Sequence, residues 1–98
     1  MSVQMVIELA DQQDARMIVH ALESYKIRLR ASIGRAHRRL EEFERRYDAA
    51  TPHFLSKMTA EDLIGGDLEY VEWAGEAKLL SGLESELSEL ERAHYQLP

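Results

Sequence analysis

Apolar residues recur at every third or fourth position over two long stretches of the chain, and this spacing predicts two amphipathic helices. The first stretch covers 11–47, where Asp11 suits the N-cap of a helix and Asp14 suits its first turn. No proline precedes Pro52, and within the stretch only Gly34 interrupts the helical pattern. The apolar positions are Ile18, Leu22, Tyr25, Leu29, Ile33, Ala36, Leu40, Phe43 and Tyr47. At 1.5 Å per residue this helix would be roughly 55 Å long, so it must pack against another element.

The second stretch covers 67–96 and follows Gly65 and Gly66, which suit a turn, with Asp67 as the expected N-cap. An antiparallel register that places Phe43 opposite Trp73 brings the two apolar series together. The apolar positions of this second stretch are Tyr70, Trp73, Ala77, Leu80, Leu83, Leu87, Leu90, His94 and Leu97. The same register sets cations beside acids, namely Arg28, Arg30, Arg35 and Arg38 beside Glu76, Glu84, Glu86 and Glu89. We therefore predict an all-α fold, built as a long antiparallel helical hairpin in a single domain over 1–98.

The connection between the long helices carries helix signals of its own, so we expect short helices within 51–64. Thr51 followed by Pro52 is typical of an N-cap with proline at the first helical position, and Thr59 with Asp62 can begin a further turn. Most aromatic residues fall between Phe43 and Trp73, which predicts that this end of the hairpin is the best packed. The residues expected to close it are Phe54, Leu55, Met58, Leu63 and Ile64.

The segment 1–10 has two readings that the pattern leaves open. Val3, Met5, Ile7 and Leu9 alternate with other residues as in a short strand, which without a second strand would be an extended arm or would pair with another chain. The other reading continues the long helix upstream.

Composition narrows the functional classes. The 98 residues carry a net charge of −6 and no cysteine, which excludes disulfides, thiolate metal sites and cysteine nucleophiles. No apolar run suits a membrane span and the start lacks the features of a secretory signal, so we expect a cytoplasmic protein. The cations concentrate in 25–39, but the acidic overall charge and the lack of interleaved aromatic residues argue against nucleic acid as a direct ligand.

We find no phosphate-binding loop, no hydrolase signature and no cofactor motif, so we expect a protein that is not an enzyme. One alternative is a metal-binding helical bundle. Glu91 and His94 have the Glu-x-x-His spacing that such bundles use, and the antiparallel register places Glu23 and His20 close to them.

A single hairpin leaves apolar positions outside its own interface. These positions predict a homodimer that forms a four-helix bundle, with an interface made by Met17, Val19, Ile27, Val71 and Leu79.

Three segments carry a resemblance to a known family: Leu40 to Tyr47, the pair Phe54 and Leu55, and Gly66 to Trp73. Together they resemble small helical antitoxin-like proteins of bacterial and archaeal toxin–antitoxin gene pairs, over roughly 39–80. The family often has glycine after the tyrosine, where this chain has Asp48.

The resemblance implies a protein-binding module that neutralises a cognate toxin by direct contact. By that analogy the contact would be made by Glu69, Glu72 and Glu76 with Tyr70 and Trp73. A structural helical-bundle subunit without a toxin partner is the remaining alternative.

Overall fold

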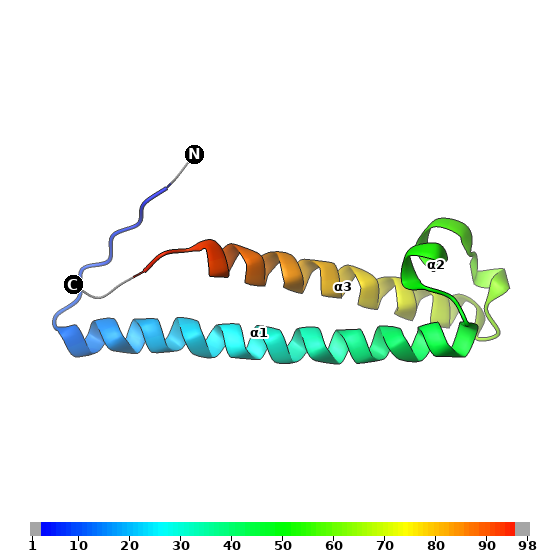
Figure 1. The fold of residues 1–98 in the computed structure, drawn as a ribbon, viewed down its shortest axis with the longest axis horizontal. Helices are drawn as coiled ribbons and strands as arrows, with labels where there is room; N and C mark the ends of the chain where they lie inside the picture. The colour runs from blue at the N-terminus through cyan, green and yellow to red at the C-terminus, as the bar shows by residue number, and fades with distance from the viewer. Residues whose placement is uncertain (1–2, 96–98) are drawn as a thin grey trace.

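The structure of the protein is a computed structural model that describes residues 3–95. Its elements are α1 (Gln12–Tyr47), α2 (Thr51–Lys57), the 3-10 helix η1 (Ala60–Asp62) and α3 (Gly66–Arg92). Figure 1 shows α1 and α3 side by side and antiparallel, with α2 folded over the end where they are connected. The described residues contain no strand, so the predicted all-α fold with a long hairpin and short connecting helices is confirmed.

Both ends of α1 are capped, one as predicted and one in an unusual backbone conformation. The carboxylate of Asp11 accepts a hydrogen bond of 2.9 Å from the backbone N–H of Asp14, which confirms the predicted N-cap. At the other end Asp48 adopts the left-handed conformation (φ 48°, ψ 48°) while its N–H donates to the carbonyl of Glu44. This is the conformation for which helices usually recruit glycine.

The start of α2 differs from the prediction, because Thr51 is not its N-cap. Ala50 occupies that position, and Thr51 is already helical and buried. The Thr51 hydroxyl accepts a hydrogen bond of 3.0 Å from the indole N–H of Trp73, and the Thr51 backbone N–H donates to the Glu44 carboxylate at 2.7 Å. The hydroxyl and the backbone N–H of Thr51 therefore make tertiary hydrogen bonds instead of capping the helix.

The turn expected at Thr59 is the 3-10 helix η1, with the Asp62 carboxylate accepting from the Thr59 N–H at 2.8 Å. In contrast, Asp67 is not the N-cap of α3. The helix begins one residue earlier, at Gly66, whose φ of +61° confirms that the glycine pair serves a turn, and Asp67 lies in the first turn.

The second long helix ends at Arg92, earlier than the predicted 96. The chain becomes extended at Ala93, and Tyr95 then bonds to Lys26 and Glu23 of α1. This side-chain docking holds the end of the chain against α1 after the helix has stopped. The last predicted helical position and Leu97 lie outside the described residues.

The core lies at the connected end of the hairpin, as predicted, and Trp73 is at its centre. Trp73 and Phe54 are fully buried and stack with ring centroids 3.9 Å apart, while Phe43 stacks on Trp73 from α1 at 5.5 Å. The contact of Phe43 with Trp73 is the one on which the predicted register was built. The buried cluster comprises Ala36, Leu40, Phe43, Phe54, Leu63, Trp73 and Leu80.

The predicted charge pairing between the long helices is largely wrong. Ion pairs across the hairpin join Arg30 to Glu91 (3.1 Å), Arg39 to Glu72 (3.2 Å) and Arg46 to Glu69 (2.5 Å). Within the described residues, the other three arginines expected to pair make no ion pair: Arg28, Arg35 and Arg38. They are exposed and lie outside the face of α1 that carries Leu29 and Ala36, so their side chains do not reach α3.

Residues 3–10 form neither the strand nor the upstream helix. They are exposed, from Val3 at 92% to Leu9 at 39%, and form an extended arm that leads away from the hairpin (Figure 1). The whole molecule is elongated, with extents of 59 × 27 × 18 Å and a radius of gyration of 19.2 Å. A compact domain of this length has a radius of gyration of about 13 Å, so this fold keeps an unusual share of its side chains at the surface.

Candidate partner-binding site

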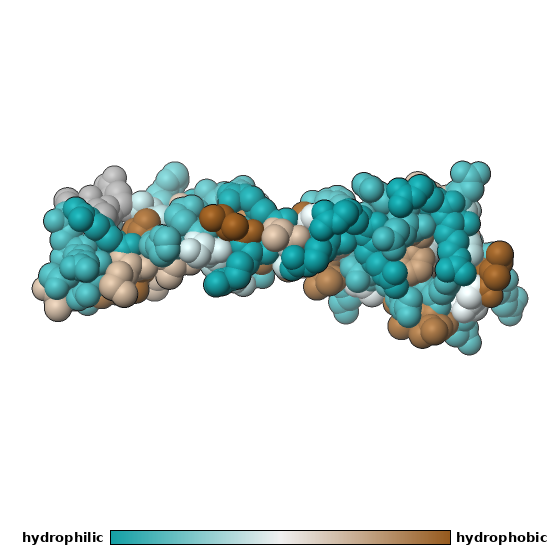
Figure 2. All heavy atoms as spheres, turned by 90° about the horizontal axis from the view of Figure 1, so that it is seen from below, coloured by the Kyte–Doolittle hydropathy of each residue, from teal (hydrophilic) through white to brown (hydrophobic). Residues whose placement is uncertain are grey.

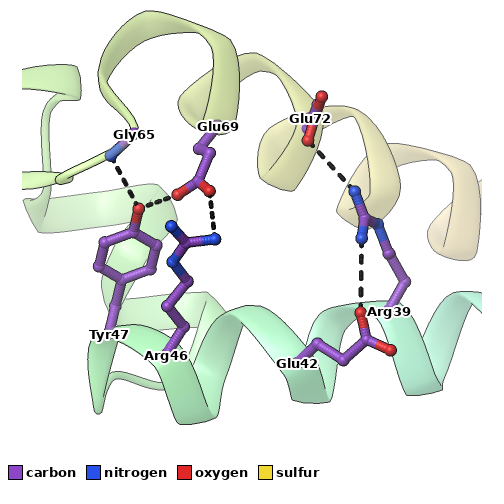
Figure 3. Close-up of polar contacts among 7 residues, drawn as sticks. All are labelled: Arg39, Glu42, Arg46, Tyr47, Gly65, Glu69 and Glu72. Atoms are coloured by element: carbon purple, nitrogen blue, oxygen red, sulfur yellow. Dashed lines mark hydrogen bonds and ion pairs between the residues drawn. The ribbon is translucent and has the colours of Figure 1, made fainter.

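The turn between η1 and α3 is held in place by a tyrosine from the end of α1 (Figure 3). The backbone N–H of Gly65 donates to the hydroxyl oxygen of Tyr47 at 3.1 Å, and that hydroxyl donates to the carboxylate of Glu69. Within the turn, the N–H of Gly66 donates to the carbonyl of Leu63 at 3.0 Å. Side chains of α1 and α3 thus help to determine the path of this turn.

Glu69 is the residue that joins the two long helices at this point. Its side chain is only 14% exposed, and besides Tyr47 it contacts the guanidinium of Arg46 at 2.5 Å. One turn further along, Arg39 bridges Glu42 of its own helix and Glu72 of α3 (Figure 3). A carboxylate that already has two such partners is costly to withdraw, so the network keeps the start of α3 in a defined position.

The position of the Glu69 side chain favours glycine at position 65. A Cβ atom built there would overlap the carboxyl end of Glu69, so any side chain would shift this carboxylate relative to Tyr47. The neighbouring Gly66 has open space instead, and its positive φ is what favours glycine there. The two glycines therefore serve different purposes, which their adjacency in the sequence does not reveal.

The turn presents Ile64 to solvent. Leu63 points into the core with 5% exposure, whereas Ile64 is 91% exposed, contrary to the prediction that both close the end of the hairpin. Leu55 is likewise exposed, while Phe54 and Met58 pack in or against the core as expected. The physical reason is that consecutive side chains of an irregular turn diverge, so both cannot reach the core.

Further large apolar side chains are exposed on the elements next to this turn. We call Ile64, Leu68 and Val71 the tip patch; their exposed fractions lie between 67% and 91%. Figure 2 shows apolar atoms gathered at this end of the molecule. Exposed acids accompany them, including Glu61, Asp62 and Asp67. An apolar surface with an acidic border suits a partner surface that is apolar and surrounded by cations.

The residues predicted to bind a partner are mostly engaged within the molecule. Trp73 is fully buried between Phe43 and Phe54, so its assignment to a partner surface is wrong. Tyr70 is half-buried with its ring against Phe54, and Glu69 and Glu72 are in the network described above. Glu76 is half-buried and makes no ion pair with any described residue, so its role stays a prediction.

Ile64 and Leu68 were not among the predicted partner-binding residues, and the exposed position of Leu55 was not predicted. A signal was present, because Ile64 and Leu68 fall outside the apolar period of α3. An apolar residue beside a glycine pair and off the helical pattern has no place in the hairpin interface.

The predicted metal site is not assembled. Glu91 pairs with Arg30, and His94 lies beyond the end of α3, so the two no longer share a helix face. Glu23 accepts a hydrogen bond from Tyr95, which lowers the pKa of its carboxyl group, and it also pairs with Lys26. Among the described residues no group of three metal-ligating side chains, His20 included, converges on one point.

Tyr95 also contacts Lys26, a buried cation of α1. The ammonium of Lys26 donates to the Tyr95 hydroxyl at 2.8 Å, which raises the pKa of Lys26, and lies 4.9 Å from the centre of the tyrosine ring. Lys26 is 8% exposed, so this member of the basic stretch 25–39 is turned inward.

The residues predicted to form a dimer interface are exposed, apart from the half-buried Val19. They are divided between the two helices: Met17 and Ile27 lie on α1, and Val71 and Leu79 on α3. That a second copy of the chain covers these residues in a homodimer remains a prediction.

Comparisons with known proteins identified no relative of this chain. The sequence matches no protein-family model, and comparison with curated proteins and with solved structures gave no significant match. Among the described residues, no helix is both long enough and apolar enough to span a bilayer.

Proposed function

We propose that this chain is a protein-binding module without catalytic activity, which neutralises a cognate toxin by direct contact through the tip patch. The observation that carries the proposal is the 91% exposure of Ile64 on a turn whose backbone is held by Tyr47. A large apolar side chain in such an exposed position does not stabilise the isolated fold. Its burial by a partner would supply the missing stabilisation.

The rigidity of the turn supports a role in binding. Association is weakened when loops and side chains must first be ordered, so a surface that is already in position loses less free energy on binding. Ile64 stands on a turn tied to Tyr47, Glu69 and Gly65, and Leu68 stands on the first turn of α3. These are the properties of an apolar anchor at the centre of an interface.

Charge supports a basic partner. Residues Glu61, Asp62 and Asp67 are exposed beside the tip patch, and Lys57 is the nearest cation along the chain. Proteins that act on RNA carry basic surfaces, and opposite fields would speed the encounter with such a toxin. The tip patch also lies within the segment 39–80 that carries the antitoxin resemblance.

The test is co-expression with the product of the neighbouring gene, followed by calorimetric titration of the purified pair. Ile64→Asp should weaken binding by roughly 30-fold or more, equivalent to about 2 kcal/mol. In the co-expression experiment this variant should also restore less of the growth that the toxin inhibits. Ile27→Asp is the matched control, because Ile27 is also an exposed isoleucine (63%) but lies on α1 away from the tip.

Two outcomes would contradict the proposal. One is equal weakening by the two aspartate variants, which would separate binding from the tip patch. The other is complete absence of a complex between the wild-type chain and the neighbouring gene product, because the toxin we propose is the product of that gene, as in the toxin–antitoxin gene pairs that the sequence resembles.

A further inference from the structure

The outer face of α3 carries a second exposed surface, distinct from the tip patch. Gly82 follows Trp73 by nine residues, or about two and a half turns, and therefore lies opposite the buried face of the helix. Around it is a shallow hollow of about 510 Å³ lined by Gly75, Lys78, Leu79, Gly82, Leu83 and Glu86. Leu79 is 52% exposed at the edge of this hollow.

The two glycines are not explained by the packing of the hairpin. A Cβ atom at Gly75 or Gly82 would meet no other atom within 4 Å, and neither residue has a positive φ. Glycine in a helix interior is nevertheless the least favourable residue after proline. An alanine would fit at both positions of the isolated molecule and would favour the helix. The absence of a side chain at Gly75 and Gly82 therefore suits a contact with another molecule.

The shape of this surface would suit a second copy of the same helix. A leucine that projects and a hollow that would receive it lie on the same helix face, one turn apart. If two α3 helices pack antiparallel about a two-fold axis near Gly82, Leu79 of each copy enters the hollow of the other. Because glycine allows close approach of two backbones, the contact is deepest at the axis.

The charges fit the same arrangement. Lys78 and Glu86 are each four residues from Gly82, in opposite directions, so the axis places Lys78 of one copy opposite Glu86 of the other, twice. Among the described residues Lys78 makes no ion pair, and Glu86 accepts a hydrogen bond from Tyr25. We infer that the Gly75–Gly82 face of α3 is the docking surface for α3 of a second copy of this chain.

This interface is independent of the toxin contact and uses only part of the set predicted from the sequence. It includes Leu79, but not Val71, which belongs to the tip patch, nor Met17, Val19 and Ile27, which lie on α1. One helix pair buries less area than the roughly 800 Å² per partner of a standard interface, so we expect a dissociation constant in the micromolar range.

Sedimentation equilibrium of the purified chain alone, from about 5 to about 500 µM, tests the inference. The wild-type chain should pass from monomer to dimer, and Gly82→Leu should raise the dissociation constant at least about tenfold because the new side chain fills the hollow. Its helical circular dichroism should be undiminished, since leucine favours helix over glycine. Ala31→Leu, which adds the same side chain to an exposed position on α1, should leave the dissociation constant unchanged.

Charge reversal identifies the occupant as a second copy. Lys78→Glu and Glu86→Lys should each weaken the dimer, and the double variant should recover it, because only a two-fold partner carries both changes. A monomer at the highest concentration, a dimer that Gly82→Leu leaves intact, or a double variant no better than the single ones would overturn the inference. None of these outcomes depends on a toxin.

Discussion

At the scale of single residues, the fold depends on how one indole is surrounded. Trp73 stacks against Phe54 and Phe43, and its N–H donates to the buried hydroxyl of Thr51. Thr51 is in turn connected to α1 through Glu44. The side chain therefore contacts α1 and α2 from α3, and stability should depend on it more than on any exposed residue.

Trp73→Ala should lower the free energy of unfolding by about 3 to 5 kcal/mol, because it leaves a cavity among residues that cannot fully close it. Urea denaturation followed by circular dichroism measures this. Trp73→Phe is the control, since it keeps an aromatic ring but removes the donor to Thr51, and it should cost clearly less. A loss below about 1 kcal/mol for the alanine variant would mean that the core does not depend on the indole.

At the scale of the elements, the end of α1 is where the local sequence suits the backbone least. Asp48 adopts φ 48° and ψ 48°, a conformation that glycine enters without steric cost. The chain must turn sharply there, because only Ala49 and Ala50 separate Asp48 from α2. The backbone geometry at the end of α1 therefore favours glycine at position 48.

Asp48→Gly should stabilise the protein by about 0.5 to 1 kcal/mol, because the strain of a left-handed residue with a Cβ atom is removed. Thermal denaturation at neutral pH is a sufficient measurement. Asp48→Ala is the comparison and should be destabilising, since alanine tolerates this conformation less well than aspartate does. If glycine proved less stable than aspartate, the helix would end differently in solution.

At the scale of the whole molecule, shape and charge distribution matter more than any single contact. The hairpin is 59 Å long and only 18 Å in its thinnest dimension, and most side chains of α1 are exposed. Arg28, Arg35 and Arg38 are among them, and they add positive charge to one face of an acidic protein. Exposed charges of this kind contribute little to stability.

Replacing Arg35 and Arg38 together with glutamine should change the free energy of unfolding by no more than about 0.5 kcal/mol, because neither makes an ion pair across the hairpin. We also expect no binding to duplex DNA or RNA in fluorescence anisotropy, given the net charge of −6. Affinity that falls steeply with salt and disappears in the double variant would instead identify this face as a nucleic-acid site.

Periodic and local features of the sequence were enough to predict the architecture. The two helices, the antiparallel register through Phe43 and Trp73, and the cap at Asp11 were all predicted, because helical period and capping depend on residues close together in the chain. The aromatic end was predicted for a related reason: large apolar rings bury themselves wherever a second element allows it.

Features that depend on where side chains point could be established only from the folded structure. The sequence does not show which of Leu63 and Ile64 points inward, nor that Thr51 would bond to Trp73 instead of capping α2. It also suggested partners on α3 for Arg28, Arg35 and Arg38, which make no ion pair across the hairpin. Each of these outcomes depends on distances between residues remote in sequence, and so does the candidate site, where Tyr47 of one helix bonds to the turn at the start of the other.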